Sequence, residues 1–133
     1  MSPSPHLGQS VTWVYTEDLA GTAAFYAETL GLDMVFDQGP CRIFSMGGTG
    51  FLGVCQVRPG RYVEPKGVVI TFVTDDVDGW YARLAERGAP LDAPPTRSEA
   101  FNVYAFFTRD PNGYKLEFQT FLDPRWQRGA ERN

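Results

Sequence analysis

Apolar and polar positions follow the same order in two successive stretches of the chain. Apolar, β-branched runs at 11–15 (VTWVY) and 68–73 (VVITFV) predict strands. Each run continues into a similar hexapeptide, TEDLAG at 16–21 and TDDVDG at 74–79, and the two hexapeptides are offset by 58 positions (74 − 16). A period this long that occurs only twice indicates a duplicated module and not an array of short repeats.

Each hexapeptide begins a helical pattern. Asp18 and Asp76 are suited to N-cap a helix, because an aspartate side chain accepts hydrogen bonds from the free backbone N–H groups of the first turn. Gly31 and Gly88 are suited to end the two helices, since glycine adopts a left-handed conformation at little steric cost. We therefore expect one helix in each module.

Three further strands are expected after each helix. The predicted strands lie at 32–36, 42–46 and 51–57 in the first module and at 90–92, 102–108 and 114–121 in the second. Gly50 and Gly113 begin the last strand of each module and are offset by 63 positions (113 − 50), so the second module holds five extra residues (63 − 58). We assign them to a loop at 93–98 that covers a site.

The predicted fold class is α+β, with two β-α-β-β-β modules in tandem. We expect a disordered N-terminal tail at 1–9, one domain at 10–122 and a C-terminal tail at 123–133. Within the domain, module one covers about 10–57, a linker 58–67, and module two about 68–122.

Composition and charge limit which kinds of binding partner the protein can have. The chain has 133 residues, 43% of them hydrophobic, and a formal net charge of −4 without a Lys/Arg block, which argues against nucleic-acid binding. Its apolar runs are far shorter than a membrane span. Residues 1–9 have neither the basic nor the apolar region of a secretory signal, so we expect a cytoplasmic protein.

Cysteine and histidine usage bears on metal binding. Cys41 and Cys55 fall on adjacent predicted strands at a spacing that fits neither a metal site nor a disulfide scaffold, so we expect two reduced, half-buried thiols. His6 is the only histidine and lies in the N-terminal tail. A histidine-rich zinc or iron site therefore cannot be built from the body of the chain.

Two motifs resemble the signatures of a known family. The segment FYAETLGL at 25–32, and the turn DPNG at 110–113 followed by Glu117-Phe118, are similar to signatures of the vicinal oxygen chelate superfamily. That superfamily includes glyoxalase I, extradiol dioxygenases and bleomycin resistance proteins. The resemblance covers roughly 11–121 and implies a curled mixed sheet around a shared cleft, with the helices packed outside.

The resemblance also implies where metal ligands of the family would fall. Glu117 matches one ligand position, and the others fall on Val11, Val69 and a position near Gly53 or Val54, for which we take Val54. Valine and glycine side chains offer no lone pair, and one carboxylate cannot satisfy an ion that takes four to six ligands. We therefore expect no cofactor and no divalent metal.

Glu117 is the one catalytic candidate. Strand alternation puts it on the face away from the helix. One interpretation is a solvated residue, or one paired with Arg42 on a neighbouring strand. The other is a hydrogen-bond acceptor or general base for an organic ligand.

The candidate ligand-binding residues combine apolar walls with a few polar groups, a make-up that suits a flat or hydrophobic organic molecule. They are Trp13, Tyr15, Gln56, Val69, Thr71, Tyr104, Phe106, Glu117 and Gln119.

Three function classes remain open. The favoured one is a metal-free protein that binds a small organic molecule, in the manner of the resistance proteins of the family. The second is a lyase, isomerase or dioxygenase of the glyoxalase type that uses Glu117 as general base or metal ligand. The third is an interaction module without a ligand, against which the predicted aromatic lining argues. We also expect a homodimer, with the first-module aromatics and 121–126 as contacts.

Overall fold

The computed structural model describes residues 4–126, and the chain divides into two compact units, Met1–Val63 and Glu64–Asn133. The boundary between them lies inside the predicted linker at 58–67, so the units correspond to the two predicted modules. Residues 4–9 of the predicted N-terminal tail form neither helix nor strand, whereas 124–126 of the predicted C-terminal tail are helical. The remaining tail residues, 1–3 and 127–133, lie outside the described residues.

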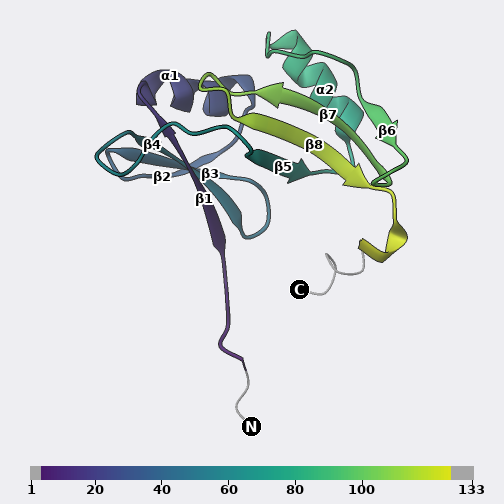
Figure 1. Ribbon diagram of the computed structural model, residues 1–133, viewed down its shortest axis with the longest axis horizontal. Helices are drawn as coiled ribbons and strands as arrows, with labels where there is room; N and C mark the ends of the chain where they lie inside the picture. The colour runs from purple at the N-terminus through teal and green to yellow at the C-terminus, as the bar shows by residue number, and fades with distance from the viewer. Residues whose placement is uncertain (1–3, 127–133) are drawn as a thin grey trace. The chain divides into compact units, whose positions relative to one another are not determined.

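The first unit is a four-stranded mixed sheet with one helical segment (Figure 1). Its elements are β1 (Ser10–Thr16), α1 (Leu19–Ala24), a π-helix η1 (Phe25–Thr29), β2 (Met34–Asp37), β3 (Cys41–Ser45) and β4 (Gly50–Gln56). The strand order is β1-β4-β3-β2, in which β1 is parallel to β4 and the other neighbours are antiparallel.

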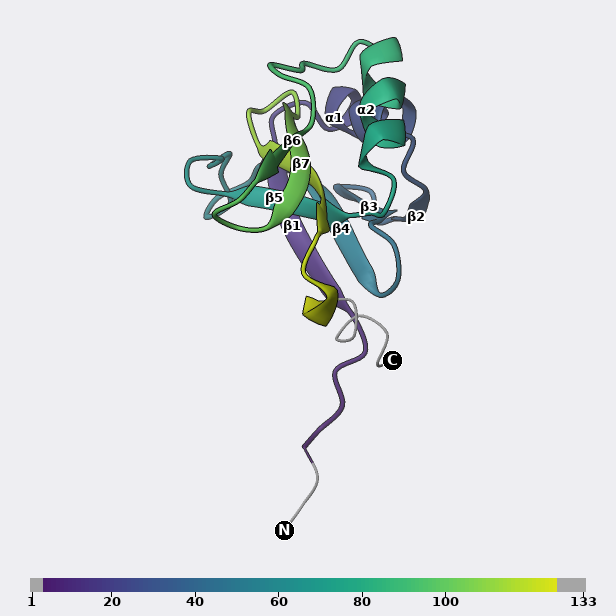
Figure 2. The ribbon, with the colours of Figure 1, turned by 90° about the vertical axis from the view of Figure 1, so that its right-hand side faces the viewer.

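The second unit repeats this plan. Its elements are β5 (Val69–Val73), α2 (Val77–Glu86), β6 (Thr96–Ser98), β7 (Val103–Arg109) and β8 (Lys115–Phe121), and its strand order is β5-β8-β7-β6. Figure 2 shows α2 along one face of this sheet. The α+β class and the duplicated β-α-β-β-β order are thus confirmed. In the described part of the chain, no helix has the length and apolar character needed to cross a membrane.

The repeated hexapeptide forms the same turn in both units. The side chain of Asp18 accepts the Gly21 N–H at 3.0 Å, and Asp76 accepts the Gly79 N–H at 3.0 Å. The threonine two positions before each aspartate accepts the aspartate N–H, also at 3.0 Å. A Cβ atom at Gly21 or Gly79 would lie 2.3 or 2.2 Å from the capping carboxylate. The pattern Thr-x-Asp-x-x-Gly is therefore a structural motif that starts each helix.

The predicted helix ends are also confirmed. Gly31 and Gly88 have φ angles of 77° and 78°, in the left-handed region that glycine adopts readily.

Each sheet buries one face beneath its helix. In the first unit, Val14, Phe44 and Leu52 are at most 1% exposed. In the second, the ring of Phe118 stacks on Phe106 and on Trp80 of α2, with centroid distances of 5.2 and 5.0 Å. Since side chains alternate along a strand, the intervening residues point to the opposite face. We call this the open face of each sheet.

The predictions for the segment after α2 are wrong. Residues 90–92 form no strand, and β6 lies inside the predicted loop at 93–98. The carbonyl of Pro90 accepts the Thr108 hydroxyl at 2.6 Å, and proline has no N–H to donate to a sheet. β6 instead pairs antiparallel with β7, with Thr96 opposite Ala105.

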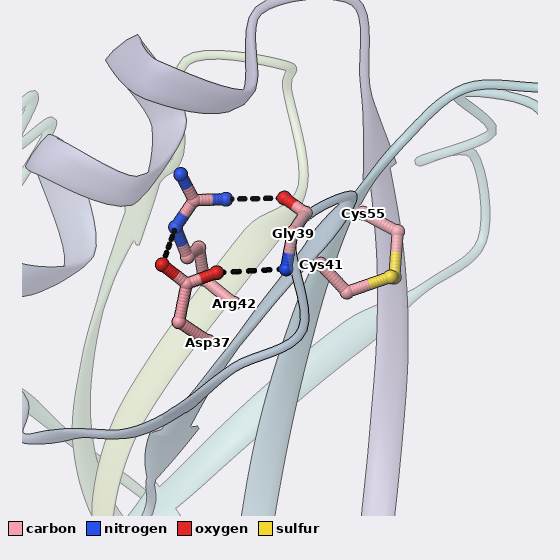
Figure 3. Close-up of a disulfide and its surroundings, with 5 residues drawn as sticks. All are labelled: Asp37, Gly39, Cys41, Arg42 and Cys55. Atoms are coloured by element: carbon pink, nitrogen blue, oxygen red, sulfur yellow. Dashed lines mark hydrogen bonds and ion pairs between the residues drawn. A yellow bond between two sulfur atoms is a disulfide. The ribbon is translucent and has the colours of Figure 1, made fainter.

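The prediction of two reduced thiols is also wrong, because Cys41 and Cys55 form a disulfide (Figure 3). The two residues lie directly opposite each other in the β3–β4 pair. The Gln56 N–H donates to the Pro40 carbonyl at 2.9 Å, which makes the cysteine pair a non-hydrogen-bonded one, the closer type of antiparallel pair. Their Cα atoms are 4.1 Å apart. Disulfides are typical of oxidising compartments, so this bond does not favour the expected cytoplasmic location, which stays a prediction.

Arg42 stabilises the turn beside the disulfide. Its guanidinium lies 3.3 Å from the Asp37 carboxylate and donates to the Gly39 carbonyl at 2.7 Å (Figure 3). Arg42 thus has a carboxylate partner within its own unit, and its pairing with Glu117 stays a prediction.

We predict that replacing both cysteines (Cys41→Ser with Cys55→Ser) lowers the free energy of unfolding by about 3 kcal/mol, because a cross-link across a short loop restricts the unfolded chain. The cysteines are 14 positions apart. Guanidinium unfolding followed by circular dichroism measures the difference. A reductant should destabilise the natural protein and leave the double variant unchanged. Two free thiols in the denatured, unreduced protein would contradict the bond.

Candidate functional site

The open face of the first sheet carries aromatic side chains. Val14 and Thr16 are buried on the helix side of β1, whereas Trp13 is 42% exposed. By alternation, Trp13 and Tyr15 share the face away from α1. These two candidate binding residues thus lie on the open face of the first sheet.

Trp13 lies over a glycine. Trp13 and Gly53 are neighbours in the parallel β1–β4 pair. A Cβ atom at Gly53 would lie 2.2 Å from the six-membered ring of Trp13. The indole therefore occupies the space that any larger residue at position 53 would need, and its position depends on that glycine.

Trp13 and Tyr15 line an open depression of about 470 Å³ in the first unit. The other lining residues are Gln38, Pro40, Cys41, Cys55, Arg58 and Arg61. One wall of this depression, which we call the Trp13 depression, is aromatic, and the disulfide forms another part. The arginines add positive charge, which could not be predicted at this site because they lie in the predicted linker.

The open face of the second sheet carries a polar cluster. The Thr71 hydroxyl donates to Oε1 of Glu117 at 2.8 Å, and the Gln119 amide donates to the same oxygen at 3.1 Å. These three predicted residues are thus brought together by the parallel β5–β8 pair and by alternation along β8. The predicted orientation of Glu117 is confirmed.

The two clusters occupy equivalent positions in the duplicated modules. Thr71 follows Trp13 by the repeat offset (71 − 13 = 58), and its strand neighbour Glu117 corresponds to Gly53. Val54, which we chose as the counterpart of Glu117, is fully buried. That choice is wrong by one residue, and an error of one residue reverses the face of a strand.

The same error affects Gln56. Its side-chain oxygen accepts the Leu19 N–H at 3.2 Å, and its amide donates to the Glu17 carbonyl at 3.0 Å. Gln56 thus binds the backbone at the start of α1, so its predicted place on the open face is wrong. The residue that corresponds to Gln119 is Cys55, not Gln56.

Tyr104 and Phe106 also lie on the helix side. The Tyr104 hydroxyl donates to the Asp78 carboxylate on α2, and this hydrogen bond raises the pKa of Tyr104. The Phe106 ring packs edge-on against Tyr81 of α2 at 5.3 Å and is 2% exposed. Both were predicted to contact the ligand, but they lie beneath α2 instead, because no motif in the sequence fixes the alternation along β7.

A second open depression, of about 630 Å³, lies in the second unit. Its lining includes Val69, a predicted ligand-binding residue, together with Phe107 and Lys115. The Lys115 ammonium lies 4.3 Å from the centroid of the Phe107 ring. Arg109 and Asp92 also line this depression, and their ion pair, at 2.7 Å, lowers the pKa of Asp92. The charges of this depression are largely paired.

Comparison with known proteins agrees with the family resemblance of the two sequence motifs. The sequence model of the Glyoxalase/Bleomycin resistance protein/Dioxygenase superfamily matches residues 5–118. No curated protein matches the chain.

Several solved structures are similar to the chain over most of its length. A glyoxalase/bleomycin resistance protein/dioxygenase from Nocardioides has a TM-score of 0.73 and 21% identity, and covers 92% of this chain and 88% of its own. A lactoylglutathione lyase from Agrobacterium tumefaciens has a TM-score of 0.67 and 25% identity, over 90% and 95%. TioX from Micromonospora sp. ML1 has a TM-score of 0.72 and 19% identity, over 86% and 98%.

The residues at the family's metal-ligand positions do not fit a divalent ion. Val11, Val69 and Gly53 offer no side-chain donor atom, and Oε1 of Glu117 already accepts two hydrogen bonds. The described residues include no group of three His, Cys, Asp or Glu side chains arranged to hold a metal.

We predict that the purified protein carries no stoichiometric transition metal, because aliphatic side chains and glycine cannot supply the missing ligands. Elemental analysis after dialysis measures the metal content. The Glu117→Ala variant is the control, and its metal content should equal that of the natural protein. About one zinc, nickel, manganese or iron per chain, lost in Glu117→Ala, would contradict the prediction.

Proposed function

Because the chain belongs to the glyoxalase/bleomycin resistance protein/dioxygenase superfamily, we propose that it binds a small, flat or hydrophobic organic molecule without a metal. The observation that carries the proposal is the position of Trp13 over Gly53. An indole held by the strand pair and left 42% exposed is a ready surface for a planar ligand.

The shape of the Trp13 depression supports this function. A volume of about 470 Å³ is within the range of small-molecule sites. Tyr15 extends the aromatic wall, and Gln38 adds a group that can both donate and accept hydrogen bonds. Val69, Thr71, Glu117 and Gln119 remain proposed ligand contacts on the open face of the second unit.

A glyoxalase-type enzyme is the second candidate. Oε2 of Glu117 has no hydrogen-bond partner among residues 4–126, so it is able to accept a proton from a ligand. The similarity to a lactoylglutathione lyase is compatible with such a role. However, the side chains that donate to Glu117 are an alcohol and an amide, and neither exchanges protons near neutral pH. Turnover that is lost in Glu117→Gln while ligand binding is retained would favour this candidate over simple binding.

We predict that Trp13→Ala weakens the binding of a planar probe such as 2-naphthamide roughly tenfold, the effect of about 1.4 kcal/mol of lost stacking and apolar contact. Isothermal titration measures the dissociation constant. The fold should survive, because the indole lies on the open face and not in the core. Phe101→Ala is a control, since Phe101 is an exposed aromatic residue (79%) that lines neither depression. A sharp fall in melting temperature for Trp13→Ala, or unchanged binding, would contradict the stacking role.

We further propose that the protein is a homodimer. The edge strand β2 exposes Met34, Val35 and Phe36, each about half accessible (49%, 51% and 56%). An exposed apolar edge strand favours association with another chain. We predict a dimer mass by light scattering at micromolar concentration, and a shift towards monomer in Val35→Lys, which places a charge on the edge. A monomer mass for the natural protein would contradict the proposal.

A further inference from the structure

Arg58 and Arg61 lie together on a tight turn that follows β4. The Arg58 N–H donates to the Arg61 carbonyl at 3.3 Å, and the Arg61 N–H donates to the Arg58 carbonyl at 2.8 Å. The two residues thus form an antiparallel bridge. Side chains of a directly opposed pair leave the backbone on the same side. Both residues line the Trp13 depression.

The positive charge of this pair has no local compensation. The residues that line the Trp13 depression include no aspartate or glutamate. Within residues 4–126, Arg42, Arg109 and Arg125 each bind an aspartate, whereas Arg58 and Arg61 make no ion pair. In a chain of net charge −4, two unpaired arginines beside an aromatic wall form a localised positive site.

The sign of this charge distinguishes between possible ligands. The face of an indole also attracts cations, so Trp13 alone would accept a planar cation or a planar anion. Two adjacent guanidinium groups repel a cation and attract an anion. A guanidinium also matches the geometry of a carboxylate, to which it can donate two parallel hydrogen bonds.

We propose that the Trp13 depression binds an aromatic carboxylic acid, with its ring on Trp13 and Tyr15 and its carboxylate between Arg58 and Arg61. This inference rests on the binding function proposed above and adds the chemical class of the ligand. Both arginines are exposed, so their contribution depends on salt.

The test compares two probes of the same shape, 2-naphthoate and the neutral 2-naphthamide. By isothermal titration at low ionic strength, the natural protein should bind the acid about tenfold more tightly than the amide. The difference should shrink at 0.5 M NaCl, where the Debye length is roughly 4 Å. The double variant Arg58→Gln with Arg61→Gln should bind the acid only as tightly as the amide, and its affinity for the amide should be unchanged. Arg97→Gln, an exposed arginine outside the depression, is the matched control.

The outcomes separate this inference from the binding function. Equal affinity for acid and amide, unaffected by the double variant, overturns the acid proposal and leaves the binding of planar molecules standing. A preference for the acid that persists in the double variant overturns the assigned role of the two arginines. Failure of both probes to bind, or indifference of both to Trp13→Ala, overturns the proposed function and this inference with it.

Discussion

A Thr-x-Asp-x-x-Gly turn joins each helix to the strand before it, and the geometry of this turn decides which face of the sheet the helix covers. The aspartate carboxylate approaches the glycine so closely that a Cβ atom has no room, at 2.2–2.3 Å. The turn therefore sets the first residue of the helix, and the helix packs over alternate strand residues such as Val14 and Phe72. The residues between them remain on the open face, where the candidate binding groups lie.

The duplicated modules support different chemistry at one structural position. In the first unit, the pair of Trp13 and Gly53 forms an apolar surface beside two unpaired arginines. In the second, the equivalent pair of Thr71 and Glu117 forms a hydrogen-bonded polar cluster. The two pairs differ from each other in charge, size and polarity. The fold therefore preserves the position of a site while the side chains determine what the site can bind.

Motifs with a local cause were predictable from the sequence, and features that depend on strand pairing were not. The helix caps and the orientation of Trp13 follow from residues within a few positions of one another. Gln56 was wrongly predicted to contact a ligand because the repeat offset at β4 could be known only to within one residue. Tyr104 was wrongly predicted to contact a ligand because no motif fixed the alternation along β7. The disulfide requires Cys41 to lie directly opposite Cys55, a register that their spacing does not reveal.

The contact between Trp13 and Gly53 also constrains how such a chain can evolve. A carboxylate at position 53 would mirror Glu117, but even a methyl group there would lie 2.2 Å from the indole ring. A side chain at position 53 must therefore displace the indole from its place over β4. The aromatic wall and a carboxylate at position 53 exclude each other, so the first unit of such a chain can carry one of the two kinds of site but not both.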